Sequence, residues 1–375
     1  MNKKTMPLPL TRRNFLGKTT KGLCAAVTLP FLSPSDLFGG LNKEEKLGIA
    51  LVGLGSYAMG QLAPALKETK NCELTALVTG TPAKAERYGK EYNIPDSHIY
   101  NYENFDGIAN NPDVDIVYVV LPNSMHAEYT IRAANAGKHV ICEKPMAVSV
   151  EECEQMITAC KANNVTLNIG YRLHFEPCNQ AIVAHTKSGK NGKPKYINAE
   201  FGFTIGDPNQ WRLKHALAGG GAMMDVGIYC IQAARYSTQE EPVAVIAQEY
   251  KTDPVKFADV DETIIWQMEF PSGAVANCTT TYNFRTERLQ VSYEQGSLRA
   301  NLSPAYGYGG IRGNLGREAL NFGNPNQQAL QMDAMAASIV AGTTLTTSGE
   351  EGLRDAKIIE AIYKSIAQNS ARIEL

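Results

Sequence analysis

The first well-defined hydrophobic segment of the chain is the apolar run from Leu47 to Val52. An uninterrupted apolar run of this length is typical of a strand that is buried on both faces of a parallel sheet. The run is followed by Gly53-x-Gly55-x-x-Ala58 and then by a segment, Gln61–Lys67, with the pattern of a helix. The sequence therefore predicts a strand, a glycine turn and a helix in succession.

Apolar runs and amphipathic segments then alternate as far as residue 169. The expected strands are Glu73–Val78, Val114–Val120, Lys138–Cys142 and Thr166–Ile169, and the expected helices are Pro82–Tyr92, His126–Ala136 and Val150–Asn163. Strands that alternate with helices form βαβ units around a parallel sheet. We therefore predict an α/β domain of the Rossmann type over residues 43–168.

The pattern changes after Tyr171, where apolar and polar residues alternate in a way typical of antiparallel strands. The expected strands are Lys195–Phe203, Thr263–Phe270, Ala274–Tyr282 and Leu289–Ser292. The segment Asn301–Phe322 is rich in glycine and tyrosine and is expected to be a mobile loop, and the helices Gln327–Val340 and Gly349–Asn369 close the chain. We predict an α+β domain over residues 169–375 with an open, largely antiparallel sheet whose free face forms a homodimer or homotetramer. The closing helices are candidates to pack back on the first domain.

Charge and hydropathy exclude two classes of partner. The 375 residues carry a net charge of −2, and no long basic run is present. Nucleic acid is therefore not an expected partner. No apolar stretch approaches the roughly 20 residues that a membrane span requires.

The N-terminal 42 residues have the features of an export signal and a short arm. The segment Thr11–Lys18 contains the pair Arg12-Arg13, and a modest apolar segment, Leu23–Leu32, follows it. This arrangement resembles a twin-arginine signal, which predicts a periplasmic protein that folds before export. The alternative is an amphipathic or disordered arm.

The cysteines predict neither disulfides nor a metal site. The chain has eight of them, with no C-x-x-C pair and no clustering with histidine at metal-ligand spacing. We expect buried thiols and no bound metal.

The glycine turn has the composition of a dinucleotide-binding loop. Gly53 can make the tight turn, Gly55 lets the backbone approach a pyrophosphate, and the small Ala58 lets the helix pack on the strand. Ser56 and Tyr57 lie between them and are expected to contact the cofactor as well. The alternative is an ordinary glycine-rich turn.

The end of the second strand favours NADP over NAD. Folds that bind NAD usually place Asp or Glu about 20 residues beyond the glycine loop. Here Val78 is followed by Thr79-Gly80-Thr81, with Lys84 and Arg87 further on. Hydroxyl groups and cations suit a 2′-phosphate. The alternatives are NAD, and a solvated helix face for Lys84 and Arg87.

Two further segments carry candidate catalytic groups. Glu143-Lys144-Pro145 directly follows a predicted parallel strand, where side chains face the ligand crevice, and Lys144 can bind a reacting oxygen and move a proton. In the glycine-started helix after residue 221, Asp225 and Tyr229 lie four apart on one face and make a plausible acid/base pair. The alternatives are a surface lysine, a capping aspartate and a core tyrosine.

Taken together, these segments resemble the glucose–fructose oxidoreductase / inositol dehydrogenase (Gfo/Idh/MocA) family over nearly the whole chain from Lys46 on. The matching motifs are Gly53-x-Gly55, Leu121-Pro122-Asn123-x-x-His126, Glu143-Lys144-Pro145, Tyr171-Arg172-x-His174, Trp211-Arg212-Leu213 and Asp225-x-Gly227-Ile228-Tyr229. Many relatives have histidine where this chain has Tyr229, and tyrosine is typical of the sugar oxidoreductase subgroup.

The resemblance implies roles for individual residues. Lys144 would contact the sugar C1 oxygen and the nicotinamide ribose, Tyr229 would exchange the hydroxyl proton, and Asp225 would position the sugar. The other sugar-binding residues would be Tyr171, Arg172 and His174, and the other cofactor-binding residues would be Leu121, Pro122, Asn123, His126, Glu143, Arg172, Trp211 and Arg212. A free tyrosine has a pKa near 10, so a base role requires a nearby positive charge such as Lys144.

The function predicted from these features is that of an exported NADP-dependent sugar oxidoreductase. It would transfer a hydride from C1 of an aldose to nicotinamide, giving a lactone, and a ketose would reoxidise the cofactor in a ping-pong cycle. One alternative is a glycoside hydrolase that uses a bound dinucleotide for transient oxidation. Another is a non-catalytic sugar-binding protein.

Overall fold

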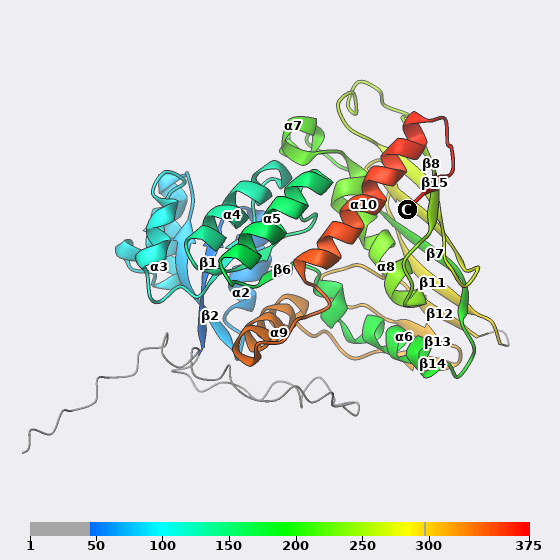
Figure 1. Cartoon of the computed structure of the whole chain (residues 1–375), viewed down its shortest axis with the longest axis horizontal. Coiled ribbons are helices and arrows are strands. Elements are labelled where there is room, and N and C mark those ends of the chain that lie inside the picture. The colour runs from blue at the N-terminus through cyan, green and yellow to red at the C-terminus, as the bar shows by residue number, and fades with distance from the viewer. Residues whose placement is uncertain (1–45, 296–297) are drawn as a thin grey trace, which may run out of the picture.

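The computed structural model describes residues 46–295 and 298–375, which form two sheets and their helices (Figure 1). The first sheet has six parallel strands in the order β3-β2-β1-β4-β5-β6. The strands are β1 (Leu47–Val52), β2 (Cys72–Val78), β3 (Ile99–Tyr100), β4 (Ile116–Val119), β5 (His139–Cys142) and β6 (Leu167–Ile169). The prediction of a Rossmann-type sheet is confirmed. The strand order reverses between β1 and β4, the position at which such sheets bind ligands.

Helices of the first domain follow the predicted positions with one exception. The longer helices are α3 (Pro82–Tyr92), α4 (His126–Asn135) and α5 (Val150–Ala162). The helix expected over 61–67 is instead a π-helical turn, η2 (Ala58–Leu62), followed by the three-residue α2 (Ala63–Ala65). Pro64 has no amide hydrogen with which to continue a regular α-helical ladder.

The second sheet has nine strands in the order β14-β13-β12-β11-β7-β10-β9-β8-β15. Its strands are β7 (Pro194–Gly202), β8 (Ala244–Tyr250), β9 (Thr263–Glu269), β10 (Val275–Thr281), β11 (Thr286–Tyr293), β12 (Arg299–Leu302), β13 (Gly313–Leu315), β14 (Glu318–Leu320) and β15 (Ile373–Glu374). Every pairing is antiparallel except that of β7 with β10. The prediction of an open, largely antiparallel sheet is confirmed.

The segment 301–322 is more ordered than a loop. It contains the end of β12 and the whole of β13 and β14, and Tyr306 within it is buried. Short strands with glycine and tyrosine carry little local signal, and here the pairing partners supply the backbone hydrogen bonds.

Helices cover one face of the second sheet and fill the space between the two sheets (Figure 1). They are η6 (Arg172–Phe175), α6 (Pro177–Ser188), η7 (Trp211–Leu213), α7 (His215–Ala218), η8 (Met223–Gly227), α8 (Ile228–Thr238) and α10 (Gly349–Ala367). On the covered face, Ile264, Trp266 and Val291 are buried. The opposite face is not covered by any described element.

Helix α9 (Gln327–Ala341) belongs to the second half of the chain but packs on the first sheet. Met332 and Met335 share a core cluster with Ile49 and Leu51 of β1. Asp333 accepts hydrogen bonds from the backbone amides of Lys70 (2.8 Å) and Asn71 (2.7 Å). The C-terminal part of the chain therefore completes the core of the N-terminal domain.

The seven described cysteines are buried free thiols, as predicted. Cys24 and the twin-arginine segment lie outside the described residues. Within 46–295 and 298–375, no helix is long and apolar enough to cross a membrane, and no three His, Cys, Asp or Glu side chains are grouped so as to hold a metal ion.

Candidate active site

A cavity of about 420 Å³ opens between the first sheet and the second domain. Its walls come from the loop after β5, from η6, β7, η7, η8, α8 and β11, and from the segment after β12. The residues that line it are Lys144, Arg172, Phe201, Gly202, Phe203, Gln210, Arg212, Asp225, Val226, Tyr229, Arg285, Glu287, Tyr306, Gly307 and Tyr308. The three residues expected to be catalytic, Lys144, Asp225 and Tyr229, therefore meet in one cavity.

Asp225 is the centre of a charged cluster in the cavity wall. Its Oδ1 lies 3.2 Å from Nζ of Lys144, and its Oδ2 lies 3.0 Å from Nε of Arg212. Tyr282 donates its hydroxyl hydrogen to the same Oδ2 at 2.9 Å. Lys144 also donates to the backbone oxygen of Asp225. We refer to Lys144, Arg212, Asp225 and Tyr282 as the Asp225 cluster.

The interactions within the Asp225 cluster stabilise the charged forms of Asp225 and Lys144. Burial alone would raise the pKa of Asp225, but Lys144, Arg212 and the Tyr282 hydrogen bond outweigh it and lower that pKa to about 2. Burial would lower the pKa of Lys144, but the negative charges that Tyr229, Asp225 and Glu143 can carry raise it overall. Lys144 is therefore a cation and Asp225 a carboxylate at neutral pH.

Tyr229 lies between two cations. Nζ of Lys144 is 4.8 Å from the centre of its ring, and the guanidinium carbon of Arg172 is 5.1 Å from it. The residue is 9% exposed, and Phe201 packs against the ring edge-on. The ring that is proposed to exchange a proton with the substrate is therefore held between the two cationic side chains of the cavity.

The glycine-rich turn before Asp225 is fixed by a buried carboxylate. Asp261 accepts hydrogen bonds from the backbone amides of Gly221 (2.6 Å) and Met223 (2.8 Å), and from the hydroxyl of Tyr363 (2.7 Å). The following turn, η8, is π-helical and leads directly into α8. Asp225 and Tyr229 face the same cavity, as their spacing predicted.

The glycine loop is shaped for a dinucleotide. Gly53 has φ +92°, and a Cβ there would lie 2.3 Å from the oxygen of Val120, so no other residue fits. A Cβ at Gly55 would meet no atom within 4 Å, which leaves its backbone open to a ligand. Ala58 is fully buried where the helix packs, and Ser56 is exposed beside it. A pyrophosphate fits this loop by the criteria of its fold class.

Of the residues expected to bind the 2′-phosphate, two lie near the loop. Nζ of Lys84 donates to the oxygen of Leu54 in the glycine loop at 3.0 Å. Thr79 is buried at the end of β2 and accepts the amide hydrogen of Thr81. Arg87 lies on the solvent face of α3, where its Nε is 3.9 Å from a carboxylate oxygen of Glu91.

The segment Leu121–His126 is held by its own polar groups. The His126 ring is buried, with Nδ1 2.8 Å from the oxygen of Pro145 and Nε2 2.9 Å from that of Leu121. Asn123 donates to the oxygen of Ala218 at 2.8 Å. His126 and Asn123 thus join this segment, Pro122 included, to the loops that carry Lys144 and Asp225.

Arg172 supports the cavity wall. Its guanidinium donates to the backbone oxygens of Gly307 (2.9 Å) and Tyr306 and to Gln327 of α9, and it lies 4.7 Å from the Tyr308 ring centre. The ring of Tyr308 faces Tyr57 of the glycine loop at 5.7 Å. Arg172 therefore fixes the segment that brings Tyr308 to the cavity.

Tyr171 and His174 differ from expectation, because the structure places them outside the cavity. The His174 ring lies 3.7 Å from that of Tyr236, and burial lowers its pKa to about 3. Tyr171 is buried beside it, toward Asp355. In a 3₁₀ turn, side chains three residues apart lie over one another. Tyr171 and His174 therefore share a face, and Arg172 between them points to the cavity.

The remaining predicted residue, Trp211, packs under Arg212, whose guanidinium lies 4.6 Å from its ring. Sequence reasoning missed Tyr282, Tyr306, Tyr308 and Gln327. Tyr282 directly follows the run Thr279-Thr280-Thr281 of a predicted strand, so its position at a strand end was a usable signal. The other three carry no local pattern that distinguishes them.

Comparison with known proteins identifies the family. Residues 47–171 match the oxidoreductase family with an NAD-binding Rossmann fold, and residues 180–299 match the GFO/IDH/MocA C-terminal domain. The chain belongs to the Gfo/Idh/MocA family of oxidoreductases. It is an enzyme of the class that acts on CH–OH groups of sugars.

Known proteins that are similar over most of the chain include a sugar dehydrogenase and a sugar oxidoreductase. The NADP-dependent D-xylose 1-dehydrogenase of Haloarcula marismortui is 31% identical over 343 residues, which cover 88% of this chain and 94% of that protein. The crystal structure of an aldose-aldose oxidoreductase from Caulobacter crescentus, complexed with glycerol, is 45% identical, with a TM-score of 0.84 over 88% of this chain and 100% of that one.

Proposed function

We propose that the protein is an NADP-dependent aldose oxidoreductase that oxidises C1 of an aldose to a lactone. The observation that carries this proposal is the convergence of Lys144, Asp225 and Tyr229 on a cavity whose wall residue Tyr308 packs against Tyr57 of the glycine loop. The two relatives support the substrate class and the cofactor. The position of Lys84 and the absence of a carboxylate after Val78 support NADP.

The side chains supply proton transfer and orientation. Tyr229, as a phenolate, accepts the proton of the C1 hydroxyl, while Lys144 binds the same oxygen. Asp225 holds Lys144 in place and keeps it charged. The nicotinamide, when bound, accepts the hydride that leaves C1. Loss of one proton and one hydride converts the cyclic aldose to its lactone.

A second sugar would complete the cycle. In the reverse direction, protonated Tyr229 returns its proton to the carbonyl oxygen of an acceptor sugar as that carbon receives the hydride. The acceptor is a ketose or another aldose. The similarity to an aldose-aldose oxidoreductase supports this ping-pong scheme.

The first experiment is to purify the protein without added cofactor, add glucose or xylose, and follow the absorbance of reduced nicotinamide. A rise that collapses on addition of fructose or a second aldose is the expected result. A bound dinucleotide with no response to any sugar, together with cleavage of aryl glycosides, would favour the glycosidase alternative. Sugar binding without a dinucleotide or turnover would favour a binding protein.

We also propose export through the twin-arginine segment, which lies outside the described residues. Fractionation of cells that express the full chain should place it in the periplasm. A chain with Arg12→Lys and Arg13→Lys should stay in the cytoplasm.

The uncovered face of the second sheet supports a homo-oligomer. A row of amide side chains crosses it in register, from Gln267 through Asn277, Asn198 and Gln290 to Asn301. Ile265 and Tyr196 on neighbouring rows are 40% and 42% exposed. Light scattering should show a dimer or tetramer, and Asn198→Lys should shift it toward the monomer.

A further inference from the structure

Glu143 is a buried carboxylate at the carboxyl edge of the first sheet. It directly follows β5 and is 7% exposed. Burial raises its pKa, although Tyr118, Lys144 and Arg172 partly oppose this effect. A carboxylate in such a place stays charged only with support from its neighbours.

Part of the support for the charged form of Glu143 comes from Tyr118 in the sheet and from α9 packed on it. Tyr118 of β4 donates its hydroxyl hydrogen to Oε1 of Glu143 at 2.7 Å. Gln331 of α9 donates an amide hydrogen from Nε2 to the oxygen of Tyr118, also at 2.7 Å. Both Tyr118 and Gln331 are fully buried.

The directions of these two hydrogen bonds are fixed by the chemistry of the groups. A hydroxyl group has one hydrogen, and an amide nitrogen donates but does not accept. Because Gln331 donates to the oxygen of Tyr118, the single hydroxyl hydrogen remains directed at Glu143. Hydrogen bonds in such a chain strengthen one another.

We propose that Gln331 is a positioning residue that acts through Tyr118 to keep Glu143 negatively charged, so that the enzyme binds the oxidised nicotinamide in preference to the reduced one. The inference rests on the nicotinamide cofactor of the proposed function. The oxidised ring carries a positive charge and the reduced ring does not, so a nearby carboxylate stabilises only the oxidised form.

No other charged or titratable group described near Glu143 would stabilise the positive charge of the oxidised ring in its place. These groups are Lys144, which follows it, Arg172 of η6, Tyr57 of the glycine loop, Tyr118 and Cys142. Lys144 and Arg172 are cations that disfavour a positive ring. Burial raises the pKa of Tyr57, Tyr118 and Cys142 well above their ordinary values, so these three are neutral.

The test measures the preference without any sugar. The protein is equilibrated with equal concentrations of NADP⁺ and NADPH and separated from free cofactor, and the bound ratio is then determined between pH 6 and 9. The wild type should bind more NADP⁺ than NADPH. In Glu143→Gln the ratio of bound NADP⁺ to bound NADPH should fall by about tenfold. A tenfold change corresponds to about 30 mV for a two-electron couple.

The variants distinguish positioning from general damage. In Gln331→Glu the new carboxylate accepts the hydroxyl hydrogen of Tyr118, so Tyr118 no longer donates to Glu143. The ratio of bound oxidised to reduced cofactor in this variant should therefore approach that of Glu143→Gln. Tyr118→Phe should do the same, and Gln331→Met should give a smaller change. Gln328→Leu is the matched control, because Gln328 is equally buried on α9 and has no partner for its Nε2 among the described residues. It should leave the ratio unchanged.

The proposal is overturned if Tyr118→Phe and Gln331→Glu leave the ratio as in wild type, or if Gln331→Glu still changes it when Glu143 is already Gln. Equal weakening of both cofactor forms would also overturn it, since that result indicates only structural damage. The proposed sugar reaction stands or falls separately. If the variants change the bound cofactor ratio as expected but the wild type does not turn over a sugar, only the sugar reaction is refuted. If the wild type turns over a sugar but the variants leave the bound cofactor ratio unchanged, only the role of Gln331 is refuted.

Discussion

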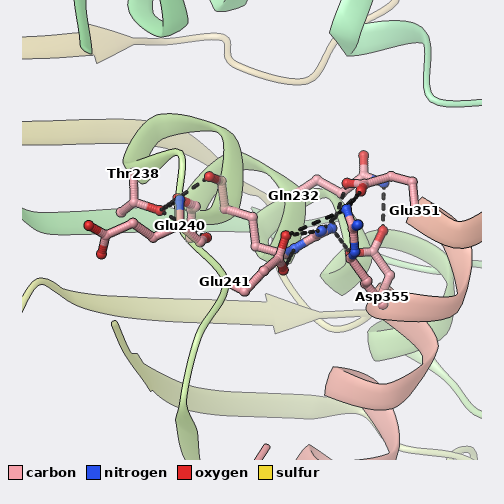
Figure 2. A network of polar contacts seen from close by, with 9 residues as sticks. Gln232, Thr238, Glu240, Glu241, Glu351 and Asp355 are labelled. Carbon is pink, nitrogen blue, oxygen red and sulfur yellow. Dashed lines mark hydrogen bonds and ion pairs between the residues drawn. The ribbon is translucent and has the colours of Figure 1, made fainter. Parts of the chain in front are cut away.

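The segment η8–α8 carries two buried charge clusters that differ in sign and in access to solvent. The Asp225 cluster pairs one carboxylate with two cations and opens to the cavity. Ten residues after Asp225 along the same segment, Arg235 contacts Glu241 at 2.7 Å, Glu351 at 2.7 Å and Asp355 at 2.6 Å (Figure 2). We refer to these four residues as the Arg235 cluster.

The contrast shows that the surroundings decide what a buried charge does. The Asp225 cluster has an excess of positive charge beside the cavity, so it can stabilise an anionic oxygen or phenolate. The Arg235 cluster has one arginine for three carboxylates and joins α8 to α10 (Figure 2). None of its four residues lines the candidate active-site cavity. The first cluster is suited to chemistry, and the second to holding the helices behind it.

The largest expected effect is on activity, at the cavity. Tyr229→Phe should lower kcat by about 10²–10⁴-fold, because the proton acceptor is lost, while the cofactor stays bound and the melting temperature hardly changes. Steady-state kinetics and extraction of the bound cofactor measure both. Tyr293→Phe is the control, since Tyr293 does not line the cavity and its hydroxyl contacts Thr186 at 3.0 Å. Unchanged turnover in Tyr229→Phe would end the catalytic assignment.

The next largest effect is on stability, at the Arg235 cluster. Arg235→Met should lower the free energy of unfolding by about 3–5 kcal/mol, because it takes the buried cation away from Asp355 and leaves Glu351 with the exposed Arg354 as its partner. Urea denaturation measures the loss. Arg354→Met removes an exposed partner of Glu351 and should cost less than about 1 kcal/mol. Equal losses in the two variants would contradict the assignment of a buried structural cluster.

The two clusters should also respond differently to pH. The pKa of Asp355 is raised to about 6 by burial and by Glu351, against the attraction of Arg235. Its contribution to stability is therefore complete below the ordinary value of 3.8 and is lost as the pH rises through about 6. The stability difference between wild type and Asp355→Asn should shrink by roughly 2 kcal/mol from pH 4.5 to pH 7.

The pKa of Asp225 is shifted in the opposite direction from that of Asp355. Its pKa of about 2 lies below the ordinary value of 3.8, so its contribution is lost only as the pH falls through about 2. The stability difference between wild type and Asp225→Asn should stay constant over the same range. Denaturation curves at the two pH values test both variants, and parallel behaviour would remove the distinction between the clusters.

The smallest expected effect comes from Tyr282, whose hydroxyl hydrogen bond to Asp225 is one of several. Tyr282→Phe should lower kcat/KM by about tenfold, at the lower end of the roughly 1.5–3 kcal/mol of a hydrogen bond to a charged group, because Lys144 and Arg212 still hold Asp225. A loss as large as that of Tyr229→Phe would mean that Tyr282 takes a direct part in the reaction.

Much of the fold could be predicted from the sequence because its signals are local. Buried parallel strands are continuous apolar runs, and β1, β4 and β5 were each found within two residues of their observed ends. The short strands β12–β14 could not be found, since their few residues are stabilised by neighbouring strands rather than by their own pattern.

The sequence by itself determined the glycine loop, the residue types at strand ends and the pair Asp225 and Tyr229, because each depends on spacing within one element. Only the tertiary structure decided which neighbours these residues meet. It brought Tyr282 to Asp225, turned Tyr171 and His174 away from the cavity, and placed Gln331 of α9 beneath Glu143. Such contacts join residues far apart in the chain, where packing, and not local pattern, sets the geometry.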